Sequence, residues 1–143
     1  IEIRKELTEE WEKRGVKEGL EFAILTDEIS EAWAGLKTKE YKNLKGLKKE
    51  NLRDNVTNLE LVLNMLAETA TTEISQNKKP KTFKANKKVA KEGGTIAGNA
   101  RKEIESKTGK KVISGPSRRM PTLDTLLSGK WVRITTGRQG VII

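Results

Sequence analysis

The stretch "YKNLKGLKKENLRDNVTNLELVLNMLAE", residues 41–68, contains the cleanest apolar periodicity in the chain and the corner that leads into it. Thr57 and Glu60 form the S/T-x-x-E capping box, in which the threonine side chain accepts a hydrogen bond from the backbone of the glutamate while the glutamate reaches back. A helix is therefore expected to begin near residue 58 and to run to about residue 75.

The apolar residues of this helix recur at steps of three and four, which predicts a wide stripe facing a core. Upstream, residues 39–44 make a short helical segment before Gly46, and another short helix is expected from Lys48 to about Asn55. Because Leu52 and Val56 continue the same spacing, an unbroken helix from residue 51 stays open as the alternative. The predicted stripe consists of Leu59, Leu63, Leu66, Ala70 and Ile74, supported by Val62 and Met65.

Two further helices are predicted ahead of this stretch. Residues 2–14 read as a short charged helix ended by Gly15. The stretch "KEGLEFAILTDEISEAWAGLK", residues 17–37, reads as a second helix with Gly35 as its stop, although "FAILT" within it also fits a short buried strand. Trp33 has apolar neighbours on its face, so it is interpreted as a core anchor rather than a base-stacking residue. The apolar face of the second helix is Phe22, Leu25, Ile29, Ala32, Trp33 and Leu36.

The segment "NKKPKTFKANKK", residues 77–88, interrupts the helical pattern, since Pro80 disfavours helix at Lys79. Thr82 is expected to cap a last long helix that continues to about Lys107 and ends at Gly109. Two adjacent glycines, Gly93 and Gly94, cost helix stability unless they bend the helix or let another helix approach closely. Close packing is the favoured interpretation, because Ala90, Ala97 and Gly98 lie alongside.

The sequence thus predicts a mainly α protein with a compact domain of about four to five helices over residues 1–112. Residues 113–143 are predicted to be a divergent basic extension. Within it, Thr122 is placed to cap a brief helix to Leu127, and "KWVRITTGRQGVII" alternates like a short β-hairpin around Gly137.

Composition excludes several kinds of chemistry. The 143 residues include neither cysteine nor histidine, which removes disulfides, thiolate nucleophiles, Cys/His zinc sites and imidazole acid–base catalysis. The fragment "GGTIAGNARK" matches neither phosphate-loop spacing, and the carboxylates Asp27, Glu28 and Glu31 lack a second motif to complete a site. We therefore expect no enzyme, no cofactor and no metal.

No apolar run approaches the roughly 18 residues that a membrane span needs, and the first residues are charged where a signal peptide is apolar. A cytoplasmic protein is expected, without membrane contact. The chain begins without methionine, which fits a fragment of a longer protein.

Charge is distributed unevenly along the chain. Residues 1–76 carry 12 Lys/Arg and 16 Asp/Glu, whereas residues 77–143 carry 17 and 4. A strongly basic half is typical of proteins that contact nucleic acid through phosphates, and only Tyr41 and Phe83 are placed to stack on bases. We therefore predict salt-sensitive, largely non-specific binding. The predicted nucleic-acid-binding residues are Lys45, Lys48, Lys49, Lys78, Lys79, Lys81, Lys84, Lys87 and Lys88.

The residues "RGVKEGLEFAILTDEISEAWAGLKTKEYKNLKGLKKENLRDNVTNLELVLNMLAE" resemble the C-terminal part of the DNA damage-inducible protein D family, which is bacterial and prophage-borne. The likeness rests on "GV…FAI", on "KGLKK" and on the "EL…N.L" helix. It continues more weakly through "GTIAGNARKEIESKTG" and covers about residues 14 to 112. Members of that family usually carry an upstream BRO-type domain of the kind found in phage antirepressors.

The resemblance implies a non-enzymatic accessory protein of the SOS response that acts on DNA or on RecA-type recombination filaments. The alternative is a protein-interaction or dimerisation module of a prophage antirepressor-type protein, with homodimers joined through residues 58–75 and the small residues around Gly94 and Gly98. Lysines that converge on one face favour the first hypothesis, and an exposed apolar or glycine-lined patch favours the second.

Overall fold

The computed structural model describes residues 2–113, which form five α-helices and one 3-10 turn and contain no strand. The mainly α prediction is confirmed. Residues 114–143, with the predicted hairpin and the predicted helix at Thr122, lie outside the described residues. The elements are α1 (Glu2–Lys13), α2 (Leu20–Ala34), α3 (Thr38–Leu44), η1 (Arg53–Asn55), α4 (Asn58–Lys78) and α5 (Phe83–Thr108).

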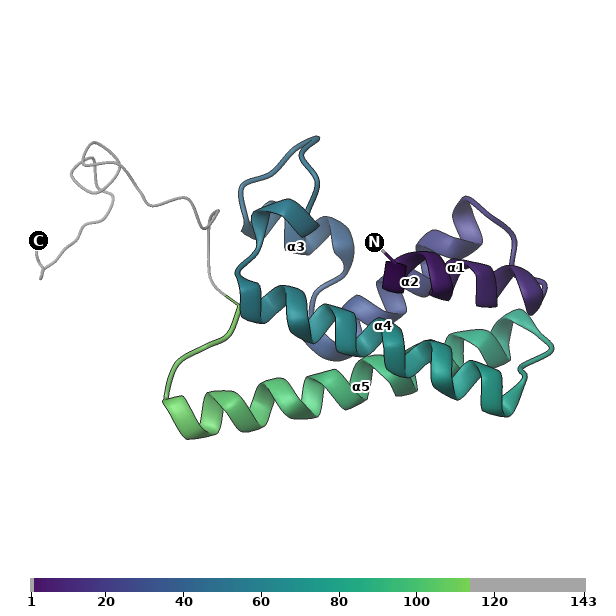
Figure 1. Ribbon diagram of the computed structural model, residues 1–143. Coiled ribbons are helices and arrows are strands. Elements are labelled where there is room, and N and C mark those ends of the chain that lie inside the picture. The colour runs from purple at the N-terminus through teal and green to yellow at the C-terminus, as the bar shows by residue number, and fades with distance from the viewer. Residues whose placement is uncertain (1, 114–143) are drawn as a thin grey trace, which may run out of the picture.

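The two longest helices, α4 and α5, form an antiparallel pair joined by a tight turn (Figure 1). Helix α2 packs along α5 and also contacts α4, while α1 lies against α4. Helix α3 packs on α2, and the loop that follows it returns the chain to the start of α4. The α4–α5 turn and the α3–α4 loop therefore lie at opposite ends of α4.

Helix α4 begins where the capping box predicts. The Glu60 backbone N–H donates to Thr57 Oγ1 at 3.1 Å, and the Thr57 N–H donates to Glu60 Oε1 at 2.8 Å. The alternative of an unbroken helix from residue 51 is wrong, because Val56 is extended, with φ −120° and ψ 165°. The short helix predicted from Lys48 is also wrong except for its last turn, Arg53–Asn55, which is 3-10.

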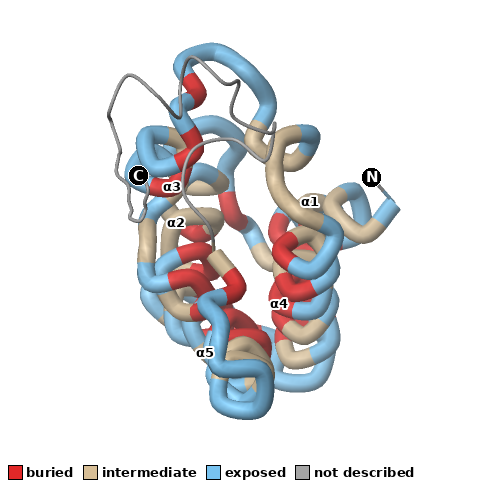
Figure 2. Tube along the Cα trace, turned by 90° about the vertical axis from the view of Figure 1, so that its left-hand side faces the viewer, coloured by how far each residue is buried: buried red, intermediate tan, exposed pale blue. Residues whose placement is uncertain are grey.

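The core forms where α1, α2, α4 and α5 face one another, and Figure 2 shows the buried residues gathered on these inner sides. Trp33 is 1% exposed, which confirms it as a core anchor. The segment "FAILT" lies within α2, so its reading as a strand is wrong. The largest apolar residues of the core are Leu7, Trp11, Leu25, Ile29 and Trp33.

The predicted core stripe of α4 is wrong in most of its members. Leu63 is buried, but Leu59, Leu66 and Val62 are 39%, 38% and 58% exposed. The helix instead turns a largely polar face inward, and its buried residues are Glu60, Leu63, Ala67, Glu68, Thr71, Thr72 and Ser75.

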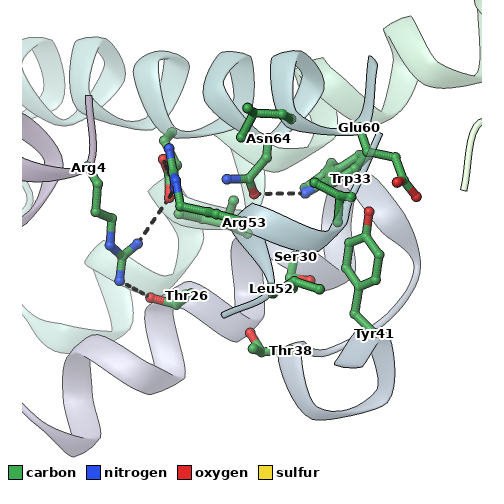
Figure 3. Close-up of a pocket in the computed structure, with 14 residues that line it drawn as sticks. Arg4, Thr26, Ser30, Trp33, Thr38, Tyr41, Leu52, Arg53, Glu60 and Asn64 are labelled. Atoms are coloured by element: carbon green, nitrogen blue, oxygen red, sulfur yellow. Dashed lines mark hydrogen bonds and ion pairs between the residues drawn. The ribbon is translucent and has the colours of Figure 1, made fainter. Parts of the chain in front are cut away.

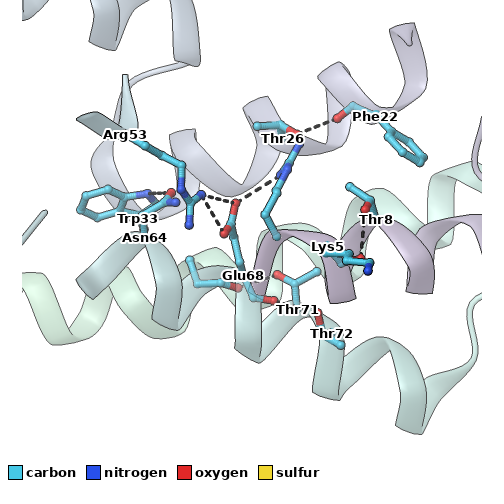
Figure 4. A network of polar contacts seen from close by, with 12 residues as sticks. Lys5, Thr8, Phe22, Thr26, Trp33, Arg53, Asn64, Glu68, Thr71 and Thr72 are labelled. Carbon is cyan, nitrogen blue, oxygen red and sulfur yellow. Dashed lines mark hydrogen bonds and ion pairs between the residues drawn. The ribbon is translucent and has the colours of Figure 1, made fainter. Parts of the chain in front are cut away.

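Polar partners from distant parts of the chain explain this orientation. Glu68 accepts from Arg4 of α1 and from Arg53 of η1, each at 3.2 Å (Figure 4). Ser75 donates from Oγ to Glu10 Oε2 at 2.7 Å. Buried polar groups are tolerated when they are hydrogen-bonded, so these contacts make the polar face of α4 a stable inner surface.

The glycines of α5 let α5 approach α2 and α4 closely, as the favoured interpretation predicts. A β-carbon on Gly93 would lie 2.7 Å from the backbone nitrogen of Thr71 in α4. One on Gly98 would lie 2.7 Å from the carbonyl oxygen of Ala32 in α2. Because Gly94 and Gly98 are buried inside the chain, the predicted dimer interface on these residues is wrong.

Candidate functional site

Seven lysines gather at the turn between α4 and α5, and we call this group the lysine corner. Helix α4 ends at Lys78, and Lys79 is its C-cap in the left-handed conformation, with φ 52°. Pro80 is buried and Phe83 packs against the core, so the turn is anchored. No carboxylate interrupts the sequence between Glu73 and Glu92. The corner consists of Lys78, Lys79, Lys81, Lys84, Lys87, Lys88 and Lys91.

Most ammonium groups of the corner are exposed and unneutralised. Lys78 pairs with Glu92 at 3.1 Å, and Lys87 lies 3.9 Å from Glu28 of α2. Both pairs are partly exposed, so each attraction is weak. The remaining five lysines of the corner are exposed and form no ion pair within residues 2–113. The corner thus presents a surplus of positive charge to solvent.

The start of α5 adds to this positive potential. Thr82 caps the helix by accepting from the Ala85 N–H at 3.1 Å, and the first turn contains no acidic residue. Helix N-termini carry a partial positive charge that anions stabilise and cations destabilise. Lys84 therefore lies where a lysine is unfavourable for the helix alone. A phosphate beside it would be attracted both by the ammonium groups of the corner and by the helix end.

A shallow groove runs beside the corner between the outer sides of α4 and α5. Its apolar members are Ile74 and Ile96, and Thr95 and Glu92 also line it. The lysines that border it are Lys78, Lys88 and Lys91. The groove therefore combines an apolar strip with a basic border.

The other predicted lysines do not join the corner. Lys48 and Lys49 are exposed in the α3–α4 loop, at the far end of the 21-residue helix α4. At 1.5 Å per residue, that helix separates the two groups by about 30 Å. Glu50 lies beside them and accepts from the Lys48 N–H, which holds the pKa of that carboxyl below its usual range.

The prediction that Lys45 binds nucleic acid is wrong. Its side chain is fully buried, and Nζ donates to Glu60 Oε1 at 2.8 Å. The ammonium group neutralises a carboxylate at the start of α4, so it is closed to an external phosphate. The two aromatic candidates for base stacking are also used internally, since Tyr41 is buried and Phe83 is packed on the core.

Two of the three predicted carboxylates of α2 have structural partners, and the third, Glu31, is exposed. Asp27 accepts from the Thr38 N–H at 3.1 Å at the start of α3, and Glu28 faces Lys87. Within residues 2–113 no group of three acidic side chains is arranged to hold a metal ion. No helix in this same range is long and apolar enough to cross a membrane.

The chain matches no family model, no curated protein and no solved structure. The resemblance to the DNA damage-inducible protein D family therefore stays a prediction.

The structure also contains a feature with no counterpart in the predicted site. It contains a partly open cavity whose lining residues come from α1, α2, α3, η1 and α4. These residues are scattered from Arg4 to Glu68, so no spacing in the sequence could have indicated that they meet.

Proposed function

We propose that the chain is a non-catalytic accessory module of the DNA damage response that contacts the phosphate backbone of DNA, free or within a recombination filament, through the lysine corner. The observation that carries the proposal is the cluster of seven lysines over residues 78–91 without an intervening carboxylate. Because these lysines are already exposed at one turn, they can contact a polyanion without a change of fold.

The placement of these lysines supports a role beyond solubility. Lys84, in the first turn, weakens the start of α5 by an amount of the order of 0.3–1 kcal/mol. A chain that needs only a solvated surface gains nothing from cations at that position. A bound phosphate group offsets the cost, because it interacts favourably with the lysines and with the helix N-terminus together.

The same geometry argues for binding without base readout. Lysines contact phosphates as point charges and carry no sequence information in doing so. Of the aromatic residues expected to stack on bases, Tyr41 is buried and Phe83 is partly buried and packed against the core. Affinity should therefore depend strongly on salt and weakly on sequence.

The test is fluorescence anisotropy with labelled single- and double-stranded DNA of several sequences, across a salt series. The proposal predicts binding at low salt, a steep fall of affinity with salt, and similar affinities for unrelated sequences. Anisotropy that stays flat at low salt would contradict it. Addition of a recombinase filament in the same assay distinguishes free DNA from a nucleoprotein target.

A second candidate function rests on the outer side of α4. Leu59, Val62 and Leu66 are 39%, 58% and 38% exposed, and Ile96 of α5 is 45% exposed. Exposed apolar residues along one helix suit a protein interface, and a second copy of this chain is the simplest partner. Sedimentation should then give a dimer for the wild type and a monomer for Leu66→Gln. A wild type that stays monomeric at high concentration rules out self-association through this side.

A further inference from the structure

A partly open cavity of about 170 Å³ lies between α2, α3 and α4 and is bordered by Arg4 of α1 and by the residues around η1 (Figure 3). For scale, an enclosed apolar cavity of about 150 Å³ accommodates one benzene molecule. The space therefore fits a single substituted ring. It is remote from the lysine corner, since no corner lysine lines it.

One end of the cavity carries a surplus positive charge. Arg4 and Arg53 share the single carboxylate of Glu68, each at 3.2 Å, so the three side chains together have one unbalanced positive charge. Both amino groups of Arg4 are hydrogen-bonded, because Nη2 donates to Thr26 Oγ1 at 2.7 Å, and its guanidinium lies over the Trp11 ring.

The guanidinium of Arg53 has fewer hydrogen-bond partners than that of Arg4. Both of its hydrogen bonds to Glu68 come from Nη1. The edge formed by Nε and Nη2 has no protein partner within the described residues, and the side chain is 27% exposed. This edge presents two parallel N–H groups, the geometry that binds a carboxylate in a bidentate manner.

The opposite end of the cavity holds two polar atoms without hydrogen bonds. Tyr41 and Glu60 are 3% and 1% exposed, and both line the cavity. The Tyr41 hydroxyl and Glu60 Oε2 each lack a hydrogen-bond partner within residues 2–113. Burial, then the nearby charge of Glu60 and the approach of its carboxylate to the hydroxyl, raise the pKa of Tyr41 well above its usual value, so the hydroxyl keeps its proton. A buried donor and a buried acceptor therefore remain unsatisfied at the same place.

The wall between the two ends suits an aromatic ring. Trp33 packs edge-to-face on Tyr41, with 6.0 Å between ring centroids, and donates from Nε1 to Asn64 Oδ1 at 3.3 Å. Figure 3 shows the arginines at one end of the space and Tyr41 with Glu60 at the other. The apolar side chains that line the cavity are Ile29, Trp33, Leu52, Val56 and Leu61.

We propose that this cavity is a binding site for a small aromatic monocarboxylate that carries a hydroxyl group at the end opposite its carboxylate. The carboxylate binds the Nε–Nη2 edge of Arg53 and neutralises the surplus charge. The ring packs against Trp33 and its apolar neighbours. The hydroxyl donates to Glu60 Oε2 and accepts from Tyr41, so that one group satisfies both unpaired atoms.

Binding at this site also has a structural consequence. The ligand contacts η1 through Arg53, α3 through Tyr41 and α4 through Glu60, so it joins elements that meet at one end of the molecule. A ligand that binds the folded but not the unfolded chain raises the melting temperature in a concentration-dependent way. The proposal does not depend on DNA binding, because no lysine of the corner lines the cavity.

The test uses 4-hydroxybenzoate as the probe, with benzoate and phenol as analogues that each lack one polar group. Isothermal titration calorimetry on the full chain should show 4-hydroxybenzoate binding at least about tenfold more tightly than either analogue, since an unpaired buried group costs roughly that factor. The increase in melting temperature that each ligand causes should follow the same order. Absence of binding by all three compounds, or equal affinities for all three, would overturn the proposal.

Two variants locate the probe. Tyr41→Phe keeps the ring that packs on Trp33 and removes only the hydroxyl, so the fold is retained, as circular dichroism would verify. This variant should lower the affinity for 4-hydroxybenzoate about tenfold and leave the affinity for benzoate unchanged. Arg53→Gln should lower the affinity for both carboxylates, 4-hydroxybenzoate and benzoate, and leave the affinity for phenol unchanged. Lys39→Gln, at an exposed position of α3, is the matched control. Unchanged affinities in Tyr41→Phe and Arg53→Gln would show that binding occurs elsewhere and would also overturn the proposal.

Discussion

Gly94 of α5 lies directly against the backbone of Ile29 in α2. A β-carbon at residue 94 would come within 2.6 Å of the Ile29 carbonyl oxygen and 2.7 Å of the Ala32 β-carbon. No rotation of a side chain relieves the first contact, because a carbonyl oxygen moves only with its helix. The distance between α5 and α2 is therefore set by the absence of a side chain at this position.

Gly94→Ala should destabilise the fold, although alanine is the better helix former by about 1 kcal/mol. The overlap with α2 forces the helices apart, and overpacking of this kind costs about 1–3 kcal/mol or more. Urea unfolding should show a lower midpoint for Gly94→Ala. Asn99→Ala, at an exposed position of the same helix, should be neutral or stabilising. Equal midpoints for Gly94→Ala and the wild type would contradict the close approach of α2 and α5.

The buried pair of Lys45 and Glu60 predicts a strong coupling energy. Lys45→Met leaves a carboxylate buried without its ammonium partner, which costs about 3–5 kcal/mol. The double variant Lys45→Met, Glu60→Met removes both charges and should recover much of this loss. It still lacks the bond from Glu60 to the Thr57 N–H, a capping contact of about 1 kcal/mol. Chemical unfolding of the two single variants and the double variant measures the coupling, and strictly additive losses would contradict a buried pair.

Tyr41 is the single tyrosine of the chain, which makes its titration directly visible. Its pKa is raised in the folded state by burial and by Glu60, whereas in the unfolded chain it is about 10. A folded pKa above the unfolded one means that its contribution to stability is complete below about pH 10 and is lost as pH rises further. Tyrosinate absorbance should therefore appear only together with the loss of helical circular dichroism.

Tyr41→Phe provides the control for this alkaline transition, because phenylalanine has no proton to lose. Its stability should fall less steeply than that of the wild type above about pH 10. A tyrosine that titrates near its usual pKa while the helices stay intact would show that its hydroxyl is open to solvent.

Local chemistry in the sequence predicted much of the fold. The capping box at Thr57 and Glu60, the cap at Thr82 and the stops at Gly35 and Gly109 all lie at helix ends. These features act over one helical turn, so nearby residues suffice to predict them. The close packing of the α5 glycines was also predicted, because two adjacent glycines weaken a helix unless they serve a contact.

The inward side of α4 could not be predicted in the same way. Periodicity shows that a helix has an apolar stripe, but the orientation of the helix depends on its tertiary partners. Glu68 faces inward because Arg4, 64 residues earlier in the chain, reaches it. In the sequence, Lys45 cannot be distinguished from its exposed neighbours Lys48 and Lys49, because its partner Glu60 lies beside it only in the folded structure. The cavity was missed for the same reason, since its walls come from five separate elements.

The central claim is that the lysine corner contacts phosphates, and a comparison of two neutralised variants tests it most directly. Both remove three charges from exposed positions, one set at the corner and one at the opposite end of α5. The corner variant is Lys81→Gln, Lys84→Gln, Lys88→Gln, and the control is Lys102→Gln, Lys107→Gln, Lys110→Gln.

The measurement is the slope of log affinity against log salt for double-stranded DNA, by fluorescence anisotropy. Each phosphate contact contributes a slope of about −0.9, so the corner variant should be less steep than the wild type by roughly 2 to 3. The control should keep the slope of the wild type. Equal slopes for the two variants, or a wild type that does not bind at low salt, would contradict the assignment of the lysine corner to nucleic acid.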